Sequence, residues 1–223
     1  NNFMLIAFLL VMLVATLVLF VLTRLAVERI ERNHYLQRAD LYRYSKIQEG
    51  DIVFLGDSIT DGGCWDELFP GLNVKNRGIN ADDTVGVLAR LDDIICCKPA
   101  ALFILIGTND LNWWAYRHDK EILDNYHEIL RRCKENSPET KVFVESILPR
   151  AKRYANHIRT LNLHLEKMAD EFGYTFINLF PYFADESGAL KAEYNNDHLH
   201  LMSTGYEQWI KLLTPYLNDF RKK

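Results

Sequence analysis

The sequence lacks the residue clusters that mark several functional classes. It has four cysteines, and no two of them have the spacing of a zinc knuckle or of a redox motif. Its net charge is −4, so it has no excess of basic residues to attract nucleic acid. We interpret the adjacent Cys96 and Cys97, which lie in an apolar stretch, as buried thiols. We therefore expect neither a bound metal ion nor a nucleic-acid partner.

The first part of the chain lacks charge. Residues 3–23 read FMLIAFLLVMLVATLVLFVLT and contain no charged residue, glycine or proline. At about 1.5 Å per residue, a helix of this length would be about 31 Å long, enough to cross the hydrocarbon core of a membrane. A cleavable signal peptide has an apolar region of only about 7–15 residues and a small-residue cleavage site, whereas this segment continues into Arg24 and Leu25. We predict that residues 1–23 are a retained, single-pass transmembrane anchor.

The segment that follows, residues 24–46, is rich in arginine, glutamate and tyrosine, and we predict a helical stalk. Its basic residues are Arg24, Arg29, Arg32, Arg38, Arg43 and Lys46, and none precedes the span. By the positive-inside rule, this favours a location in the cytoplasm for the domain that follows. The sequence starts at Asn1 rather than at Met, however, and basic residues upstream would change the count, so the side of the membrane stays open.

From residue 47 to 223 the pattern is that of one α/β domain. Short apolar runs occur at residues 52–55, around Val74, and at 101–106, 142–144 and 174–177. Between them, apolar residues three or four apart mark helices through Leu88, Leu91 and Ile95; Ile122, Tyr126, Ile129 and Cys133; Ile158, Leu161, Leu165, Met168 and Phe172; and, after Ser203, Trp209, Leu212, Leu213 and Tyr216. Continuous apolar strands that alternate with helices predict a flavodoxin-like, five-stranded parallel sheet covered on both faces.

Three polar motifs follow predicted strands or lie near the C-terminus. Gly56-Asp57-Ser58 comes directly after the first strand, where a serine is either an exposed nucleophile or merely part of a helix cap. Asp197 and His200 are spaced so that a carboxylate could orient an imidazole base, although a solvated loop, or a metal site including His198, would use the same residues. Asn109, in Gly107-Thr108-Asn109-Asp110 after the third strand, could donate to an oxyanion or simply form a turn.

Together, these motifs resemble the blocks of the SGNH hydrolase family, also called the GDSL esterases and lipases, and within it the acetylhydrolase-like members. A further block is residues 76–84, NRGINADDT, and the resemblance covers about residues 47–218. It implies a three-layer α/β/α sandwich, no cofactor and an acyl-enzyme route. In that route Ser58 attacks the ester, His200 acts as base and then as acid, and Asp197 orients His200.

The resemblance also implies an oxyanion hole made of the Ser58 N–H, the Asn109 side chain and one N–H of residues 76–84. Where the family usually has a donor glycine, this chain has Ala81, with Gly78 as a neighbour that could be mistaken for it. A backbone N–H suffices as donor, so alanine serves if its φ is negative or if left-handed strain is tolerated.

The most favoured function is a serine ester hydrolase that removes short acyl groups, acetyl above all, from carbohydrate or lipid esters. Trp113 and Trp114 either line its substrate pocket or pack beneath a loop. Two alternatives use the same residues: acyl transfer to a sugar hydroxyl, and a non-catalytic, membrane-tethered ligand-binding module. The expected partners are a small acyl ester and the membrane, and the oligomeric state stays open.

Overall fold

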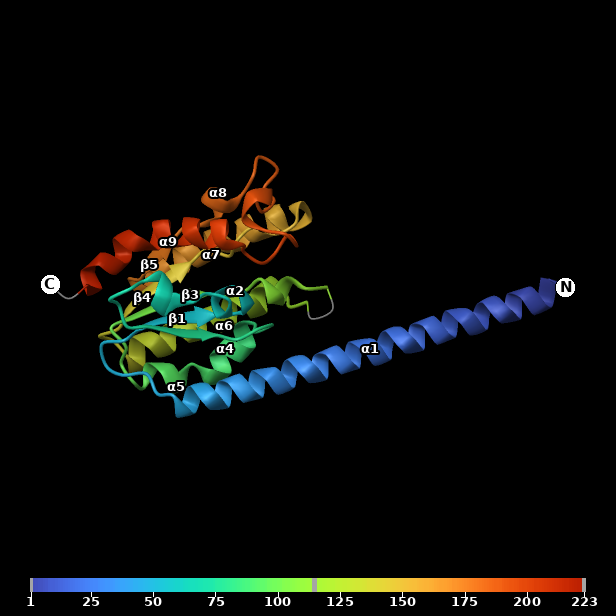
Figure 1. The fold of residues 1–223 in the computed structure, drawn as a ribbon, viewed down its shortest axis with the longest axis horizontal. Coiled ribbons are helices and arrows are strands. Elements are labelled where there is room, and N and C mark those ends of the chain that lie inside the picture. Colours follow the sequence, from blue (N-terminus) through green and yellow to red (C-terminus); the bar gives the residue numbers. More distant parts are fainter. Residues whose placement is uncertain (1, 114–115, 222–223) are drawn as a thin grey trace.

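The computed structural model describes residues 2–113 and 116–221, and its sheet lies between two layers of helices (Figure 1). The strands are β1 (Ile52–Gly56), β2 (Val74–Gly78), β3 (Ala101–Leu105), β4 (Lys141–Glu145) and β5 (Thr175–Ile177). The longer helices are α1 (Asn2–Tyr44), α6 (Asp119–Asn136), α7 (Ala155–Phe172) and α9 (Ser203–Leu217). The short ones are α2 (Ser58–Asp61), α3 (Trp65–Leu68), α4 (Thr84–Arg90), α5 (Asp92–Ile95) and α8 (Phe180–Phe183), with 3₁₀ turns η1 (Asn109–Leu111), η2 (Lys152–Tyr154), η3 (Ala192–Tyr194) and η4 (Asn218–Phe220).

All strands of the sheet are parallel and lie in the order β2-β1-β3-β4-β5. This is the order of a flavodoxin-like, doubly wound sheet, in which ligands bind beyond the carboxyl ends of the strands. Every residue of β1 and β3 is buried, because the central strands of such a sheet are covered on both faces. The predicted five-stranded parallel sheet is confirmed, and each predicted apolar run overlaps one of its strands.

Two apolar clusters fill the two sides of the sheet. In β1, Val53 and Leu55 belong to a cluster with residues of α4, α5, α6 and α7. Ile52 and Phe54 belong to a second cluster, with residues of α3 and α9, since alternate side chains of a strand point to opposite faces. Figure 1 shows α9 on one side of the sheet and α4 and α6 on the other, so the expected three-layer α/β/α sandwich is confirmed.

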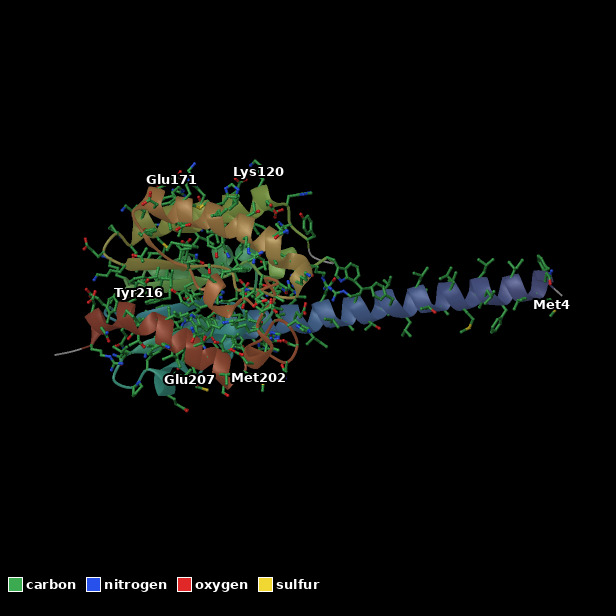
Figure 2. All side chains as sticks on the ribbon, turned by 90° about the horizontal axis from the view of Figure 1, so that it is seen from above. Met4, Lys120, Glu171, Met202, Glu207 and Tyr216 are labelled. Carbon is green, nitrogen blue, oxygen red and sulfur yellow. The ribbon has the colours of Figure 1, made fainter. Side chains whose placement is uncertain are left out.

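One continuous helix, α1, carries the apolar N-terminal segment and also packs against the domain. Every large hydrophobic side chain from residue 3 to 22 is exposed, and the helix is long and apolar enough to cross a membrane. In Figure 2 this half projects from the domain, with Met4 near its tip. The other half docks: the Tyr35 hydroxyl donates to the Gly86 carbonyl of α4 and the Tyr42 hydroxyl to the Gly78 carbonyl of β2, both at 2.9 Å.

Two details differ from expectation. Cys96 is exposed and Cys97 is partly exposed, so the interpretation of both as buried thiols is wrong. They directly follow the short helix α5, where Ile95 points into the core and the next two side chains point outward. The single helix predicted through residues 88–95 is divided into α4 and α5 at Leu91, although Leu91 keeps helical angles, φ −60° and ψ −42°.

Candidate active site

Ser58 lies at the carboxyl edge of the sheet, where β1 passes into α2. A Cβ at Gly56 would lie 2.4 Å from the Leu105 carbonyl oxygen, so the close approach of β1 and β3 requires glycine there. Asp57 caps α2 by accepting the Ile59 N–H at 2.9 Å. The cap therefore uses Asp57 and leaves the Ser58 hydroxyl available. As the first residue of α2, Ser58 also has no intrahelical acceptor for its N–H.

The loop after η3 brings His200 and Asp197 to Ser58. The Ser58 Oγ lies 2.9 Å from His200 Nε2, and His200 Nδ1 lies 2.6 Å from Asp197 Oδ2. The other carboxylate oxygen, Asp197 Oδ1, accepts the backbone N–H groups of Leu199 at 2.9 Å and His200 at 2.8 Å. The neighbouring His198 has a φ of +63° and an exposed side chain outside this line of hydrogen bonds.

Two carboxyl groups of the site have shifted pKa values. Partial burial by itself raises the pKa of Asp197, but hydrogen bonds from the His200 side chain and from two backbone N–H groups outweigh burial and lower the pKa. Asp197 is therefore a carboxylate at neutral pH and accepts the His200 Nδ1–H. Burial raises the pKa of Asp57 to about 7, against the hydrogen bond from Ile59. The Asp57 carboxyl group, next to Ser58 in sequence, thus changes its charge near neutral pH.

Ala81 has a φ of +61°, in the left-handed region that favours glycine. Among the hydrogen bonds of the described residues, none uses its N–H, and Ala81 lines the cavity over Ser58. Gly78 differs, because its N–H already donates to Asn76 Oδ1 at 2.8 Å. A Cβ on Gly78 would lie 2.1 Å from the backbone nitrogen of Asp61. Close packing of β2 on α2 therefore explains why residue 78 is glycine. Of these two residues, Ala81 is the one whose N–H can donate to a ligand in the cavity.

Asn109 follows the carboxyl end of β3 and begins η1, on the same edge as Ser58. Its Nδ2 donates to the Asp82 carbonyl at 2.8 Å, and its Oδ1 accepts from Asn112 Nδ2 at 3.3 Å. An amide nitrogen carries two N–H groups, so one is left for a further acceptor. Both contacts hold the Asn109 amide at the cavity, which it lines together with Ser58 and Ala81.

Arg90, which the sequence analysis did not single out, fixes the loop that contains Ala81. Its buried guanidinium contacts Asp82 Oδ2 at 2.7 Å and donates to the carbonyls of Arg77 at 2.9 Å and Gly56 at 3.1 Å. One side chain thus joins the ends of β1 and β2 to the loop after β2. A signal was present: Arg90 occupies a core-facing position of a helix, three residues after the buried Val87.

A cavity of about 440 Å³ opens above Ser58 and His200. Most of its lining residues are polar or charged in type; they are Arg24, Glu28, Glu31, Ser58, Asn80, Ala81, Asp83, Asn109, Asn112, Arg150, Leu199 and His200. Three of these residues come from α1, although α1 precedes the domain in sequence. Within residues 2–113 and 116–221, no group of three His, Cys, Asp or Glu side chains could hold a metal ion.

Arg150 lines the cavity and was also missed by sequence reasoning. Its guanidinium donates to the Thr108 carbonyl at 2.9 Å and to Asn112 Oδ1 at 3.0 Å, which holds the loop after β3 in place. It lies on the loop after β4, five residues beyond Glu145, so the rule that sites gather beyond the carboxyl ends of strands could have found it. Trp113 does not line the cavity: its side chain is 66% exposed and stacks on Phe20 of α1. Trp114 lies outside the described residues.

The arrangement contains the groups that acyl transfer through a serine nucleophile requires. A hydroxyl, an imidazole and a carboxylate in one hydrogen-bonded line are the groups that activate a serine nucleophile. The N–H of Ala81 and the amide of Asn109 lie on the same cavity surface as Ser58, which is where donors to a developing oxyanion are needed.

Comparisons with known proteins show which family the domain resembles. Residues 54–208 match the GDSL-like lipase/acylhydrolase family. The chain is 30% identical over 173 residues to the alpha1 subunit of platelet-activating factor acetylhydrolase IB from Bos taurus, covering 73% of this chain and 72% of that protein.

Solved structures show the same likeness. A Streptococcus pneumonia protein named for platelet activating factor superposes with a TM-score of 0.77 at 29% identity, covering 86% of this chain and 96% of the other. A GDSL-like lipase from Bacteroides thetaiotaomicron superposes with a TM-score of 0.74 at 25% identity, covering 83% and 98%. Because the match spans nearly all of the α/β domain, the chain belongs to the GDSL-like lipase and acylhydrolase family and is a carboxylic ester hydrolase.

Proposed function

We propose that the enzyme removes short acyl groups, acetyl above all, from esters of carbohydrate or lipid alcohols through an acyl-enzyme on Ser58. The observation that carries this proposal is the line from Ser58 Oγ through the His200 ring to Asp197, with gaps of 2.9 and 2.6 Å. Asp197, held by two backbone N–H groups, keeps the proton of His200 on Nδ1. His200 Nε2 is then free to take the Ser58 proton.

The reaction has two halves. Ser58 Oγ forms a bond to the ester carbonyl carbon, and the carbon–oxygen bond to the alcohol breaks as His200 returns the proton to the leaving oxygen. Water then attacks the acyl-enzyme, with His200 again as base, and releases the acid and free Ser58. The negative charge on the carbonyl oxygen in each half would be stabilised by the N–H groups of Ser58 and Ala81 and by the Asn109 amide.

The polarity of the cavity supports a short acyl chain and a polar alcohol. Only Ala81 and Leu199 among its lining residues are apolar. An acyl chain of ten or more carbons would lie against charged and amide groups, which lose water without gaining partners. A hydroxyl-rich or charged alcohol would find hydrogen-bond partners on the same surface.

We also propose that residues 1–23 anchor the enzyme in a membrane, with residues 24–46 as a stalk and residues 47–223 as the hydrolase domain. The support is the exposed apolar half of α1, which the domain does not cover. A signal sequence passes the same test of length and composition. Alkaline carbonate washing separates the two: we expect the intact chain to stay with the membrane, and its release would refute the anchor.

The catalytic proposal is tested with three variants on a chromogenic acetate ester. We expect Ser58→Ala and His200→Ala to lose at least about a thousandfold in kcat, as removal of a triad member typically does. His198→Ala is the matched control, and we expect it to keep most activity. A panel of esters graded by chain length should give the highest kcat/KM at two to four carbons. Wild-type turnover by Ser58→Ala, or a peak at ten or more carbons, would contradict the proposal.

A further inference from the structure

The stalk part of α1 is docked on the domain along one continuous helix face. The partly buried residues of this face are Arg24, Val27, Glu31, His34, Tyr35, Arg38, Ala39 and Tyr42, with spacings close to one helical turn. Arg38 forms an ion pair with Asp61 of α2 at 3.4 Å, and Arg43 pairs with Asp93 of α5 at 3.1 Å. The stalk is therefore part of the domain surface, and its N-terminal end forms one side of the active-site cavity.

The cavity begins directly where the apolar segment ends. Arg24 is the first residue after the span of residues 3–23, and Arg24, Glu28 and Glu31 all line the cavity. From Arg24 to Glu31 the helix advances about 10 Å, at about 1.5 Å per residue. The headgroup layer on each side of the hydrocarbon core is about 5–7 Å thick. With the span in the bilayer, the opening to Ser58 lies at the level of the lipid headgroups.

The loop after β3 independently reaches the same level. Trp113 stacks on Phe20, which is inside the apolar segment, with ring centroids 6.3 Å apart. Trp113 is 66% exposed and Tyr116 is 52% exposed, and such aromatic side chains are enriched at the membrane–water interface. Figure 1 shows this loop, in green, pointing along α1 in the direction in which the apolar half projects. With the span in the bilayer, the carboxyl edge of the sheet would face the membrane.

We infer that the enzyme acts on a short acyl ester carried by the polar head of an amphiphile that stays in the same bilayer, and that Arg24, Glu28 and Glu31 of α1 help to select that head. This rests on the proposed function and on the proposed anchor. Charged and amide residues line most of the cavity, so its lining suits a polar head better than a hydrocarbon tail. The tail consequently remains among the lipids while the head contacts charged groups on α1 and Arg150. Hydrolysis leaves the deacylated amphiphile in the membrane and releases the acid to water.

The test uses the full chain reconstituted in phosphatidylcholine vesicles and two acetylated glucosides that differ only in the aglycone, octadecyl or methyl. The octadecyl glucoside partitions into the bilayer, whereas the methyl glucoside stays in water. We expect kcat/KM for the octadecyl glucoside to exceed that for the methyl glucoside by at least about tenfold, mostly through KM, because the bilayer holds its head beside the cavity.

Arg24→Ala and Arg29→Ala form a matched pair on α1. Both remove one juxtamembrane positive charge, but Arg29 is exposed and does not line the cavity. For the octadecyl glucoside we expect Arg24→Ala to raise KM about tenfold, the usual cost of a lost charge-assisted hydrogen bond. We expect Arg29→Ala to change KM less than about twofold, within the usual range for an exposed surface change.

The outcomes separate this inference from the catalytic proposal. If both glucosides are cleaved equally well and the two arginine variants behave alike, the inference is wrong while the esterase proposal stands. If a chromogenic acetate and both glucosides are left intact by the wild-type chain, the proposed function itself fails. A preference for the octadecyl glucoside that Arg24→Ala abolishes and Arg29→Ala preserves supports the inference.

Discussion

Replacing Ala81 by glycine should stabilise the enzyme while leaving catalysis nearly unchanged. Ala81 has a φ of +61°, and an L-residue in the left-handed region costs about 1–2 kcal/mol. Glycine removes that cost but adds roughly 0.5–1 kcal/mol of backbone entropy to the unfolded chain. The net gain in the free energy of unfolding is then about 0.5–1 kcal/mol, or an increase in Tm of roughly 1–4 °C for a domain of this size.

Catalysis should be insensitive because the proposed contribution of Ala81 is its backbone N–H, which glycine retains. We expect kcat/KM on a chromogenic acetate to stay within about threefold of wild type, a change of less than 1 kcal/mol. Stability is measured by denaturant unfolding of the detergent-solubilised chain, followed by tryptophan fluorescence. Two of the tryptophans, Trp65 and Trp209, are fully buried in the domain and report on its core.

Ala184→Gly is the control for glycine at a position without backbone strain, where it also removes a methyl group that packs against the core. Ala184 has a φ of −82°, so glycine relieves no strain there and should destabilise the domain by about 0.5–1 kcal/mol. Opposite signs at the two positions are the expected result. Equal destabilisation at both would refute the strain argument, and a hundredfold loss of activity in Ala81→Gly would show that the alanine methyl group itself matters.

Two further predictions concern a hydrogen-bond donor and a buried acid. Asn109→Ala should lower kcat by about 10²–10³ with little change in KM; an effect as small as that of Ala81→Gly would place the oxyanion hole elsewhere. Burial raises the pKa of Glu145 to about 8, although the Trp209 indole N–H donates to its carboxyl group at 2.5 Å. The folded state therefore keeps a proton that the unfolded state releases, so this group lowers stability as pH rises from about 4.5 to 8. Denaturant unfolding at pH 5–8 measures how the free energy of unfolding falls as pH rises. In Glu145→Gln this fall should be less steep than in wild type, by up to about 1.4 kcal/mol per pH unit. Identical slopes in the two proteins would contradict the buried-acid argument.

The sheet was predictable because its signals are local. Each apolar run lies within a few residues, and a buried parallel strand has to be apolar on both faces. Ser58 and Asn109 were found because each directly follows such a run, and Asp197 and His200 because their spacing resembles a known block. The prediction that Cys96 is buried was wrong because an apolar stretch does not show which side chains at the end of a short helix face the solvent.

The contribution of α1 to the cavity could not be read from the same signals. Arg24 and Glu28 lie about thirty residues before Ser58, in a segment whose composition suggested a helical stalk. Their place depends on long-range contacts, such as that between Tyr35 and Gly86, which leave only a weak periodicity in a single sequence. The sequence also could not settle the φ of Ala81. Alanine at a position where the family usually has glycine is compatible with a negative φ or with a left-handed φ.

The most direct test of the central claim is to trap the acyl-enzyme. Wild-type enzyme is mixed with excess chromogenic acetate, quenched in acid within the first turnovers, and digested for peptide mass spectrometry. In wild type we expect one acetyl group on the peptide that contains Ser58, and in Ser58→Ala we expect none. In Asp197→Asn a larger fraction of this peptide should be acetylated if deacylation slows more than acylation. An acetyl group on another side chain that accumulates and decays at the rate of turnover, or full turnover by Ser58→Ala, would contradict the assignment of Ser58 as the nucleophile.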